Sequence, residues 1–162
     1  MDAAALRRQG YSVAALRGLA RRRLPRMVFD MVDGAAGDEI TMQRNEAALT
    51  ELALAPKLLA GAPTRDQSVE LLGVKLASPV IIGPTGLAGL LWPNAELAAA
   101  RAAARFGTIY TTSHASTATI EDIGAATNGP KWMQVFLYKD RALTAEFAAR
   151  AAANSAVRAR SL

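Results

Sequence analysis

Three short apolar runs recur along the chain from residue 78 onward, and each is followed by a stretch with helical spacing. The runs cover residues 78–82, 108–113 and 132–137. Runs of this length that are apolar on both faces are typical of strands buried in a parallel sheet. Strands that alternate with helices predict an α/β fold with a parallel sheet.

The first run ends abruptly at Gly83-Pro-Thr-Gly86. Glycine and proline at the end of a strand predict a loop whose backbone comes close to another group. In parallel α/β folds, the loops at the carboxyl ends of the strands form the binding sites. This loop is therefore the first candidate for a functional site.

The residues before the first run have helical spacing instead. Ser12 is placed to cap a helix over residues 13–23. Pro25 suits the first position of a second helix, which Gly34 ends. Residues 38–39 begin a third helix. These helices precede the sheet, so they predict an extension that packs on the main domain.

A small hairpin is predicted between this extension and the first run. Residues 68–72 and 74–76 are strand-like and flank Gly73. We therefore expect a helical extension with a loop over residues 1–65. The main domain, which includes the hairpin, is expected over residues 66–162.

Helix start signals follow each of the three runs. Residues 93–94 begin a helix that Gly107 closes, and Thr119 begins a short one. Asp140 caps a long alanine-rich helix that is expected to reach about Val157. No fourth strand follows in the pattern. Three parallel strands cannot close a barrel, which needs about eight, so the chain is expected to be cut short.

Composition narrows the possible classes of protein. The chain has 162 residues, of which 51% are hydrophobic and 20% charged, as in a globular domain. It has no cysteine and a single histidine, His114. These counts exclude disulfides, thiol nucleophiles and metal sites of cysteine or several histidines. They fit a reducing compartment, and we expect a cytoplasmic protein, with peripheral association with a membrane left open.

The net charge is +5, from 19 Lys and Arg against 14 Asp and Glu, with basic clusters at residues 21–23 and at Arg158 and Arg160. No aromatic residues alternate with these arginines, so solvated helix ends are expected rather than a nucleic-acid surface. The most apolar region, residues 71–92, is interrupted by prolines and glycines and predicts no transmembrane segment. The acidic Asp2 argues against a signal peptide.

Polar groups gather where the three predicted strands end. Gln134 lies within an apolar run, so it is expected to be buried and to need hydrogen-bond partners. A bond to neighbouring backbone is the alternative to ligand binding at this residue. The other candidates are Thr85 and Gly86 after the first strand and Thr111, Thr112, Ser113 and His114 after the second.

Most of these candidates have a structural alternative. Thr85 and Gly86 fit an ordinary turn, and His114 fits a hydrogen-bonded structural residue as well as a base. Ser113 lacks a histidine and acid partner at a useful spacing, which argues against a hydrolase. Neither glycine-rich dinucleotide nor P-loop signatures occur. Four acidic residues are expected on a solvated surface rather than as a catalytic pair: Asp30, Asp33, Asp38 and Glu39.

A longer pattern is more specific than any single motif. Residues 24–30, Leu-Pro-Arg-Met-Val-Phe-Asp, are followed by residues 33–39, Asp-Gly-Ala-Ala-Gly-Asp-Glu. Together they resemble the N-terminal segment of the FMN-dependent α-hydroxy-acid dehydrogenases and oxidases, the family of glycolate oxidase, lactate dehydrogenase and mandelate dehydrogenase. The agreement keeps one register over about residues 12–155, through Arg44-Asn45, Leu72-Gly73, Ser78-Pro79, Ile82-Gly-Pro-Thr-Gly86, Pro93, Ala100-Arg-Ala-Ala103, Gly107, Ser113, Ile120-Glu-Asp122, Gln134 and Tyr138-Lys-Asp-Arg141.

The resemblance implies about the first three β/α units of an incomplete (β/α)8 TIM barrel that binds FMN. It places Pro84, Thr85 and Gly86 against the flavin ring, and Ser113 and Gln134 at its polar edge. A flat, largely apolar ring needs a close backbone and a few placed polar groups. The family oxidises small 2-hydroxy acids of the lactate, glycolate or mandelate type to 2-oxo acids, and its full-length members are expected to be homo-oligomers.

Two residues depart from the family pattern. Met31 and Phe136 stand where the family usually has tyrosines that touch the substrate. The family's catalytic histidine, arginines and flavin lysine belong to later strands, and His114 is not that base. The resemblance therefore implies no catalytic residue in this chain, which is expected to be inactive alone. The alternatives are a non-catalytic fragment or interaction module, one half of a split enzyme, or a nucleic-acid binder supported only by net charge.

Overall fold

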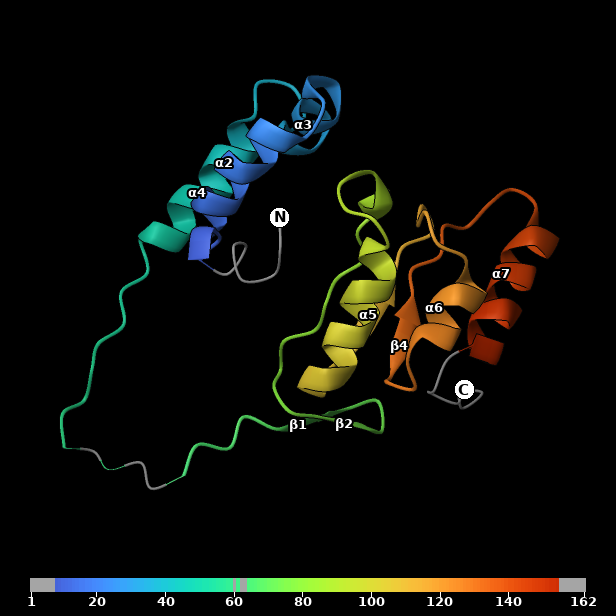
Figure 1. Ribbon diagram of the computed structural model, residues 1–162. Coiled ribbons are helices and arrows are strands. Elements are labelled where there is room, and N and C mark those ends of the chain that lie inside the picture. Colours follow the sequence, from blue (N-terminus) through green and yellow to red (C-terminus); the bar gives the residue numbers. More distant parts are fainter. Residues whose placement is uncertain (1–7, 60, 62–63, 155–162) are drawn as a thin grey trace. The chain divides into compact units, whose positions relative to one another are not determined.

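The computed structural model describes residues 8–59, 61 and 64–154. The chain divides into two compact units, residues 1–62 and residues 63–162 (Figure 1). The first unit contains helices and the second contains the strands with their helices. No helix among the described residues combines the length and the apolar character that a membrane crossing needs.

The described part of the first unit includes the helices α2 (Val13–Arg23), α3 (Arg26–Asp33) and α4 (Ile40–Thr50). Ser12 caps α2 as predicted, because its Oγ accepts a hydrogen bond from the backbone N–H of Ala15 at 3.1 Å. Gly34 ends α3, also as predicted. Pro25 lies one position earlier than predicted, as the N-cap of α3.

Two acidic side chains of α3 form exposed ion pairs. The Arg17 guanidinium donates to both carboxylate oxygens of Asp33, at 2.5 and 2.8 Å, and holds the pKa of Asp33 below its usual value. Arg26 pairs with Asp30 at 3.3 Å. These carboxylates lie on the surface and are neutralised by arginine, in agreement with the expectation of a solvated surface.

The second unit begins with the predicted hairpin. Strands β1 (Val69–Leu71) and β2 (Val74–Leu76) pair antiparallel. The two turn residues, Leu72 and Gly73, have φ values of 50° and 78°. Two consecutive positive φ values are the signature of a tight hairpin turn of the primed kind.

The rest of the second unit alternates helices and strands. These are the 3-10 helix η1 (Ala88–Leu90), α5 (Ala95–Phe106), β3 (Tyr110–Thr112), α6 (Ile120–Ala126), β4 (Lys131–Met133) and α7 (Arg141–Asn154). Helix α6 contacts both α5 and α7 (Figure 1).

The three predicted strand segments align in parallel. Strands β3 and β4 pair with Thr111 opposite Trp132. Ile82 forms a single parallel bridge with Tyr110 on the other edge of β3, supported by hydrogen bonds from Ile82 N to the carbonyl of Ile109 and from Thr111 N to the carbonyl of Ile82, each 3.0 Å. The predicted parallel α/β arrangement is confirmed, as a partial fold without a closed barrel among the described residues.

The first run was wrongly predicted as a fully buried strand. It forms one bridge instead of a regular strand, and Val80 is 64% exposed. The third run is also shorter than predicted, since β4 ends at Met133 and Leu137 is 76% exposed. Among the described residues, only β3 has a pairing segment on both edges, and only β3 is buried throughout.

The helix boundaries after residue 93 follow the predicted signals. Gly107 caps α5 with a φ of 80°. Thr119 Oγ1 accepts a hydrogen bond from Asp122 N at 3.0 Å, and Asp140 Oδ1 accepts one from Ala142 N at 2.9 Å. The predicted extension of α7 to about Val157 lies outside the described residues.

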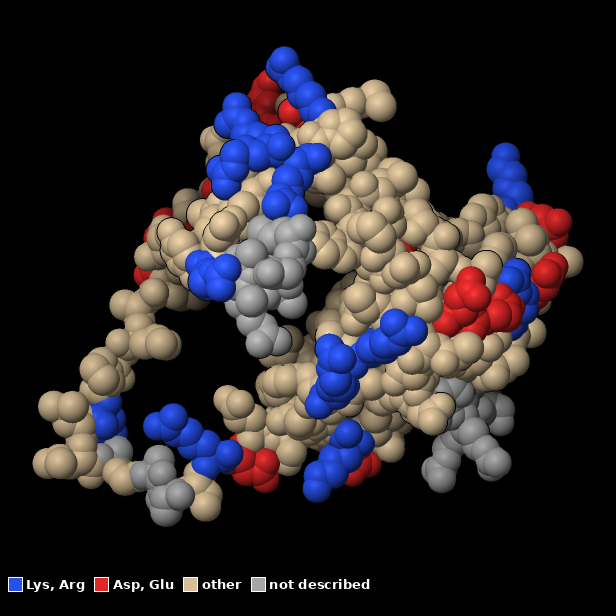
Figure 2. All heavy atoms as spheres, viewed as in Figure 1, with Lys and Arg blue, Asp and Glu red and all other residues tan. Residues whose placement is uncertain are grey.

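Within the second unit, charged side chains do not form one continuous basic surface on the face drawn in Figure 2. Lysine and arginine side chains lie there in several separate groups, with acidic side chains beside some of them. This distribution adds no support to the nucleic-acid interpretation of the net charge.

Candidate functional site

The loops that follow the first segment and β3 lie side by side at the carboxyl end of the sheet, which we call the mouth. The backbone N–H of Leu87 donates to the carbonyl of Ala115 at 2.8 Å. A Cβ built on Gly86 would lie 3.1 Å from Ala115 Cβ and 3.5 Å from Ser113 Oγ. Gly86 and Ser113, two of the residues predicted from sequence, are therefore neighbours.

Gln134 joins the mouth from the end of β4. Its backbone N–H donates to the carbonyl of Thr112 at 2.9 Å, and its side-chain oxygen accepts from His114 N at 3.0 Å. The predicted full burial is wrong, because Gln134 is only half-buried. The backbone bond predicted as the alternative is present. It uses the amide oxygen and leaves the amide NH2 group for another partner.

Ser113 is buried at the end of β3, with 7% of its surface exposed. Its Oγ accepts a hydrogen bond from Ala115 N at 3.2 Å. The hydroxyl proton is then available for donation to a ligand. Among the described residues, Ser113 makes no hydrogen bond to a histidine.

A buried carboxylate that sequence reasoning missed connects two of the mouth loops. Glu96 is 1% exposed, and its Oε1 accepts from Gly89 N at 3.3 Å, Thr117 N at 3.0 Å and Thr117 Oγ1 at 2.7 Å. We call these three residues the Glu96 network. It ties the loop after the first segment to the loop after β3.

The Glu96 network favours the ionised carboxylate. Burial raises the pKa of Glu96, but the hydrogen bonds from Thr117 and Gly89 lower it by more. The pKa of Glu96 therefore lies below its usual value. The pKa of the nearby Tyr110 phenol is shifted upward instead. Burial and the charge of Glu96 raise it to about 12.

The sequence contained a signal for the burial of Glu96. It lies four and seven residues before Ala100 and Ala103 on α5, and all three are buried. This spacing places them on one face of the helix. An acidic residue on an otherwise alanine-lined buried face indicates a carboxylate with dedicated hydrogen-bond donors.

The remaining candidates have structural partners or lie elsewhere. His114 is hydrogen-bonded to Tyr138, in agreement with the structural interpretation. Phe136 is 57% exposed beside His114. Met31 lies in the first unit. Lys131 was not a predicted site residue and lies at the opposite end of β4 from the mouth. It is buried and donates to the carbonyls of residues 127 and 129, and burial lowers its pKa.

These features define a partial α/β fold with a candidate ligand site at the carboxyl ends of parallel segments. The sequence model of the family described as FMN-dependent dehydrogenase matches residues 20–159. The chain therefore belongs to the FMN-dependent dehydrogenase family, as the resemblance predicted, and the cofactor of this family is FMN.

Curated relatives agree with this family. The chain is 39% identical over 133 residues to the peroxisomal (S)-2-hydroxy-acid oxidase GLO4 of Oryza sativa subsp. indica, covering 82% of this chain and 36% of that protein. It is 39% identical over 145 residues to the L-lactate dehydrogenase of Caulobacter vibrioides, covering 90% and 38%. The (S)-mandelate dehydrogenase of Pseudomonas putida is 38% identical over 127 residues, with coverage of 78% and 32%.

Solved structures show the same relationship. A soluble mutant of the membrane-associated (S)-mandelate dehydrogenase from Pseudomonas putida aligns with a TM-score of 0.80 at 35% identity, covering 87% of this chain and 40% of that one. Mandelate oxidase with 3,3-difluoro-2-hydroxy-3-phenylpropionic acid aligns with a TM-score of 0.82 at 30% identity, covering 88% and 43%. The chain thus spans about two fifths of the length of these proteins.

Proposed function

We propose that residues 1–162 supply part of the FMN site of an oxidoreductase that converts small 2-hydroxy acids of the lactate, glycolate or mandelate type to 2-oxo acids. The observation that carries the proposal is the meeting of Gly86, Ser113 and Gln134 at the mouth, each from a different parallel segment. Family membership supports the same cofactor. In this proposal the segments are the first β/α units of a (β/α)8 barrel.

The chemistry of the mouth fits a flavin ring. The loop of Pro84 and Thr85 is exposed and can be approached by a flat ring, and the absence of a side chain at Gly86 lets this loop pack against Ala115 and Ser113. The Ser113 hydroxyl and the Gln134 amide NH2 are two hydrogen-bond donors for carbonyl groups at the ring edge. FMN, when bound, supplies the electron acceptor for oxidation of the 2-hydroxy acid.

The role of this chain is proposed to be binding and orientation rather than proton transfer. His114 is the only histidine of the chain, and its ring is hydrogen-bonded to Tyr138. Phe136 has no hydroxyl to offer to a substrate. We therefore propose that the base and the groups that bind the substrate carboxylate come from outside residues 1–162.

The purified 162-residue chain is expected to contain less than stoichiometric flavin. When FMN is added, lactate, glycolate and mandelate are expected to leave the flavin absorbance unchanged under anaerobic conditions. The reason is that the described residues present one side of the site, and His114 in that part of the chain is already hydrogen-bonded to Tyr138. Stoichiometric yellow flavin that is bleached by any of these acids would contradict the proposal.

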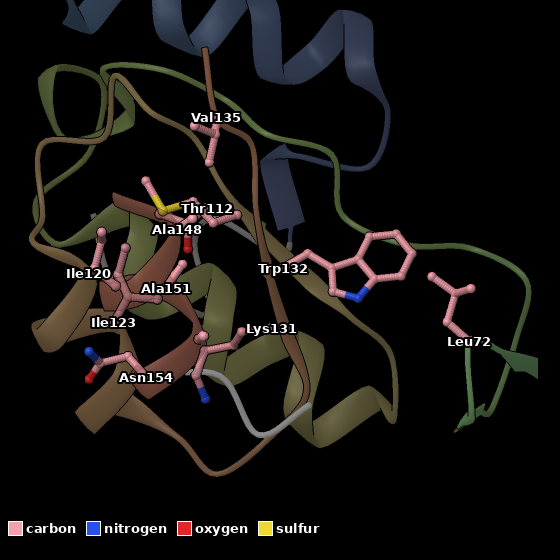
Figure 3. Close-up of a pocket in the computed structure, with 12 residues that line it drawn as sticks. Leu72, Thr112, Ile120, Ile123, Lys131, Trp132, Val135, Ala148, Ala151 and Asn154 are labelled. Atoms are coloured by element: carbon pink, nitrogen blue, oxygen red, sulfur yellow. The ribbon is translucent and has the colours of Figure 1, made fainter. Parts of the chain in front are cut away.

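A second candidate function, one half of a split enzyme, is favoured by the open edge of β4. In the described part of the second unit, the sheet consists of β3 and β4, and no strand pairs with the other edge of β4. A largely apolar pocket of about 440 Å³ lies beside this edge (Figure 3). Residues of α6, β4 and α7 that line it include Ile120, Ile123, Met133, Ala148 and Ala151.

An added strand would satisfy both features, because its backbone would pair with β4 and its apolar side chains would fill the pocket.

Co-expression with the C-terminal part of the Caulobacter vibrioides L-lactate dehydrogenase, from the position aligned with Asn154 onward, is expected to give a co-purifying, flavin-containing complex. Ala148→Glu places a charge in the pocket and should abolish co-purification, whereas Ala149→Glu, outside the pocket lining, should not. Failure of the wild-type pair to associate removes the split-enzyme proposal.

A further inference from the structure

The side chain of His114 is enclosed by three aromatic rings, which we call the aromatic box. Phe136 and Tyr138 come from the segment after β4, with ring centroids 5.7 and 5.2 Å from the imidazole. Phe147 comes from α7, with a centroid distance of 4.5 Å. Tyr138 Oη lies 2.5 Å from His114 Nε2. The box connects the loop after β3 to two elements that follow β4.

The two ring nitrogens of His114 have different environments. Nε2 faces the Tyr138 hydroxyl, whereas Nδ1 is buried and has no hydrogen-bond partner among the described residues. A neutral imidazole carries one N–H and one lone pair. A buried N–H without an acceptor is rarer and costlier than a lone pair without a donor. The geometry therefore favours the tautomer in which Nε2–H donates to Tyr138 Oη.

The backbone N–H of His114 determines the orientation of the Gln134 side-chain amide. The N–H of His114 is a donor, so the atom that it meets 3.0 Å away must be the amide oxygen of Gln134. This bond leaves the amide NH2 of Gln134, which makes no hydrogen bond within the described part of the chain. The mouth thus presents a donor at Gln134, and the opposite amide orientation would present an acceptor.

We propose that His114 is a positioning residue: the aromatic box fixes its backbone N–H, which fixes the Gln134 amide with its NH2 group available to an acceptor on the ligand. The box acts on a residue beside the mouth without supplying an atom to the ligand. The identity of that ligand, a flavin carbonyl edge, rests on the proposed function. The orientation of the amide is a property of this chain and is measurable without FMN.

The test is NMR spectroscopy of the full ¹⁵N-labelled chain, whose single histidine gives an unambiguous imidazole signal. In mildly alkaline buffer, the long-range ¹⁵N spectrum is expected to show the Nε2–H tautomer. Tyr138→Phe removes one oxygen and should raise the exchange rate of the His114 backbone amide at least about fivefold, the equivalent of one ordinary hydrogen bond. The matched control is Tyr11→Phe, because Tyr11 is an exposed phenol in the first unit.

A positioning role predicts a local effect. The Gln134 backbone amide, which donates to Thr112, should keep its exchange rate in Tyr138→Phe, and the Gln134 side-chain NH2 resonances should shift. An unchanged His114 amide, a uniform loss of protection across the sheet, or the Nδ1–H tautomer would each overturn the proposal. Since no measurement uses FMN, the outcome of the flavin experiments bears only on the proposed function and leaves this result interpretable.

Discussion

Replacing Glu96 with alanine is expected to lower the free energy of unfolding of the second unit by about 3 kcal/mol. The substitution removes the acceptor of the Gly89 N–H, the Thr117 N–H and the Thr117 hydroxyl. Because Glu96 is 1% exposed, water replaces that acceptor poorly. Tryptophan fluorescence during chemical denaturation measures the change, since both tryptophans, Trp92 and Trp132, lie in this unit.

Glu96→Gln is the conservative control. It keeps an oxygen that can accept from Thr117 but replaces the charged carboxylate with a neutral amide, so the expected loss is smaller, about 1.5 kcal/mol. A loss in Glu96→Ala no greater than in Glu96→Gln would show that the hydrogen bonds of the Glu96 network do not stabilise the fold.

The advantage of Glu96 over glutamine is expected to depend on pH in a defined direction. The pKa of Glu96 in the folded chain is below the usual value of 4.5. A lowered pKa stabilises the fold at pH values above 4.5, and this contribution is lost as the pH falls through the folded pKa. The stability difference between wild type and Glu96→Gln should therefore be constant near neutral pH and shrink in acid. A difference that grows in acid would contradict this assignment.

Gly89→Ala is expected to disrupt the same network from the opposite loop, at a cost of about 2 kcal/mol. A Cβ on Gly89 would lie 2.1 Å from Thr117 Oγ1 and 3.0 Å from Thr117 Cβ. The Thr117 side chain cannot move away without breaking its hydrogen bond to Glu96. Gly83→Ala in the same loop is the matched control, because a Cβ there meets nothing within 4 Å, and it should be nearly neutral.

A double-mutant cycle separates this clash from a general effect on the loop. In a Thr117→Ala background the side chain that blocks the new Cβ is gone, so Gly89→Ala should cost less than in the wild type. Equal costs in the two backgrounds would show that Thr117 is not the obstacle. Denaturation followed by tryptophan fluorescence again supplies the free energies.

Helix boundaries were predictable because their causes are local. Ser12, Thr119 and Asp140 each accept a hydrogen bond from an N–H two or three residues later. Burial of the first run was not predictable in this way, since it depends on segments far away in sequence. Val80 is apolar and yet exposed, because burial of an apolar run requires neighbours on both edges and both faces.

The residues of the candidate site also differ in whether local sequence could predict them. Gly86, Ser113 and Gln134 were found because they interrupt or end apolar runs, which is visible in sequence. The partners of Glu96 were missed, because Thr117 is 21 residues away and no local pattern links the two. Which atom of the Gln134 amide meets His114 likewise needed coordinates.

The single bridge at Ile82 has a mechanical consequence for the loop that follows it. The loop is attached at one end by the hydrogen bonds of Ile82 to β3 and at the other by the bond from Leu87 to Ala115. Residues 83–86 therefore form a short loop that is held at one end by β3 and at the other by the loop that follows β3. Because both ends of the loop are hydrogen-bonded, contact with a planar ring should displace its middle residues slightly. The loop should not open and close as a lid.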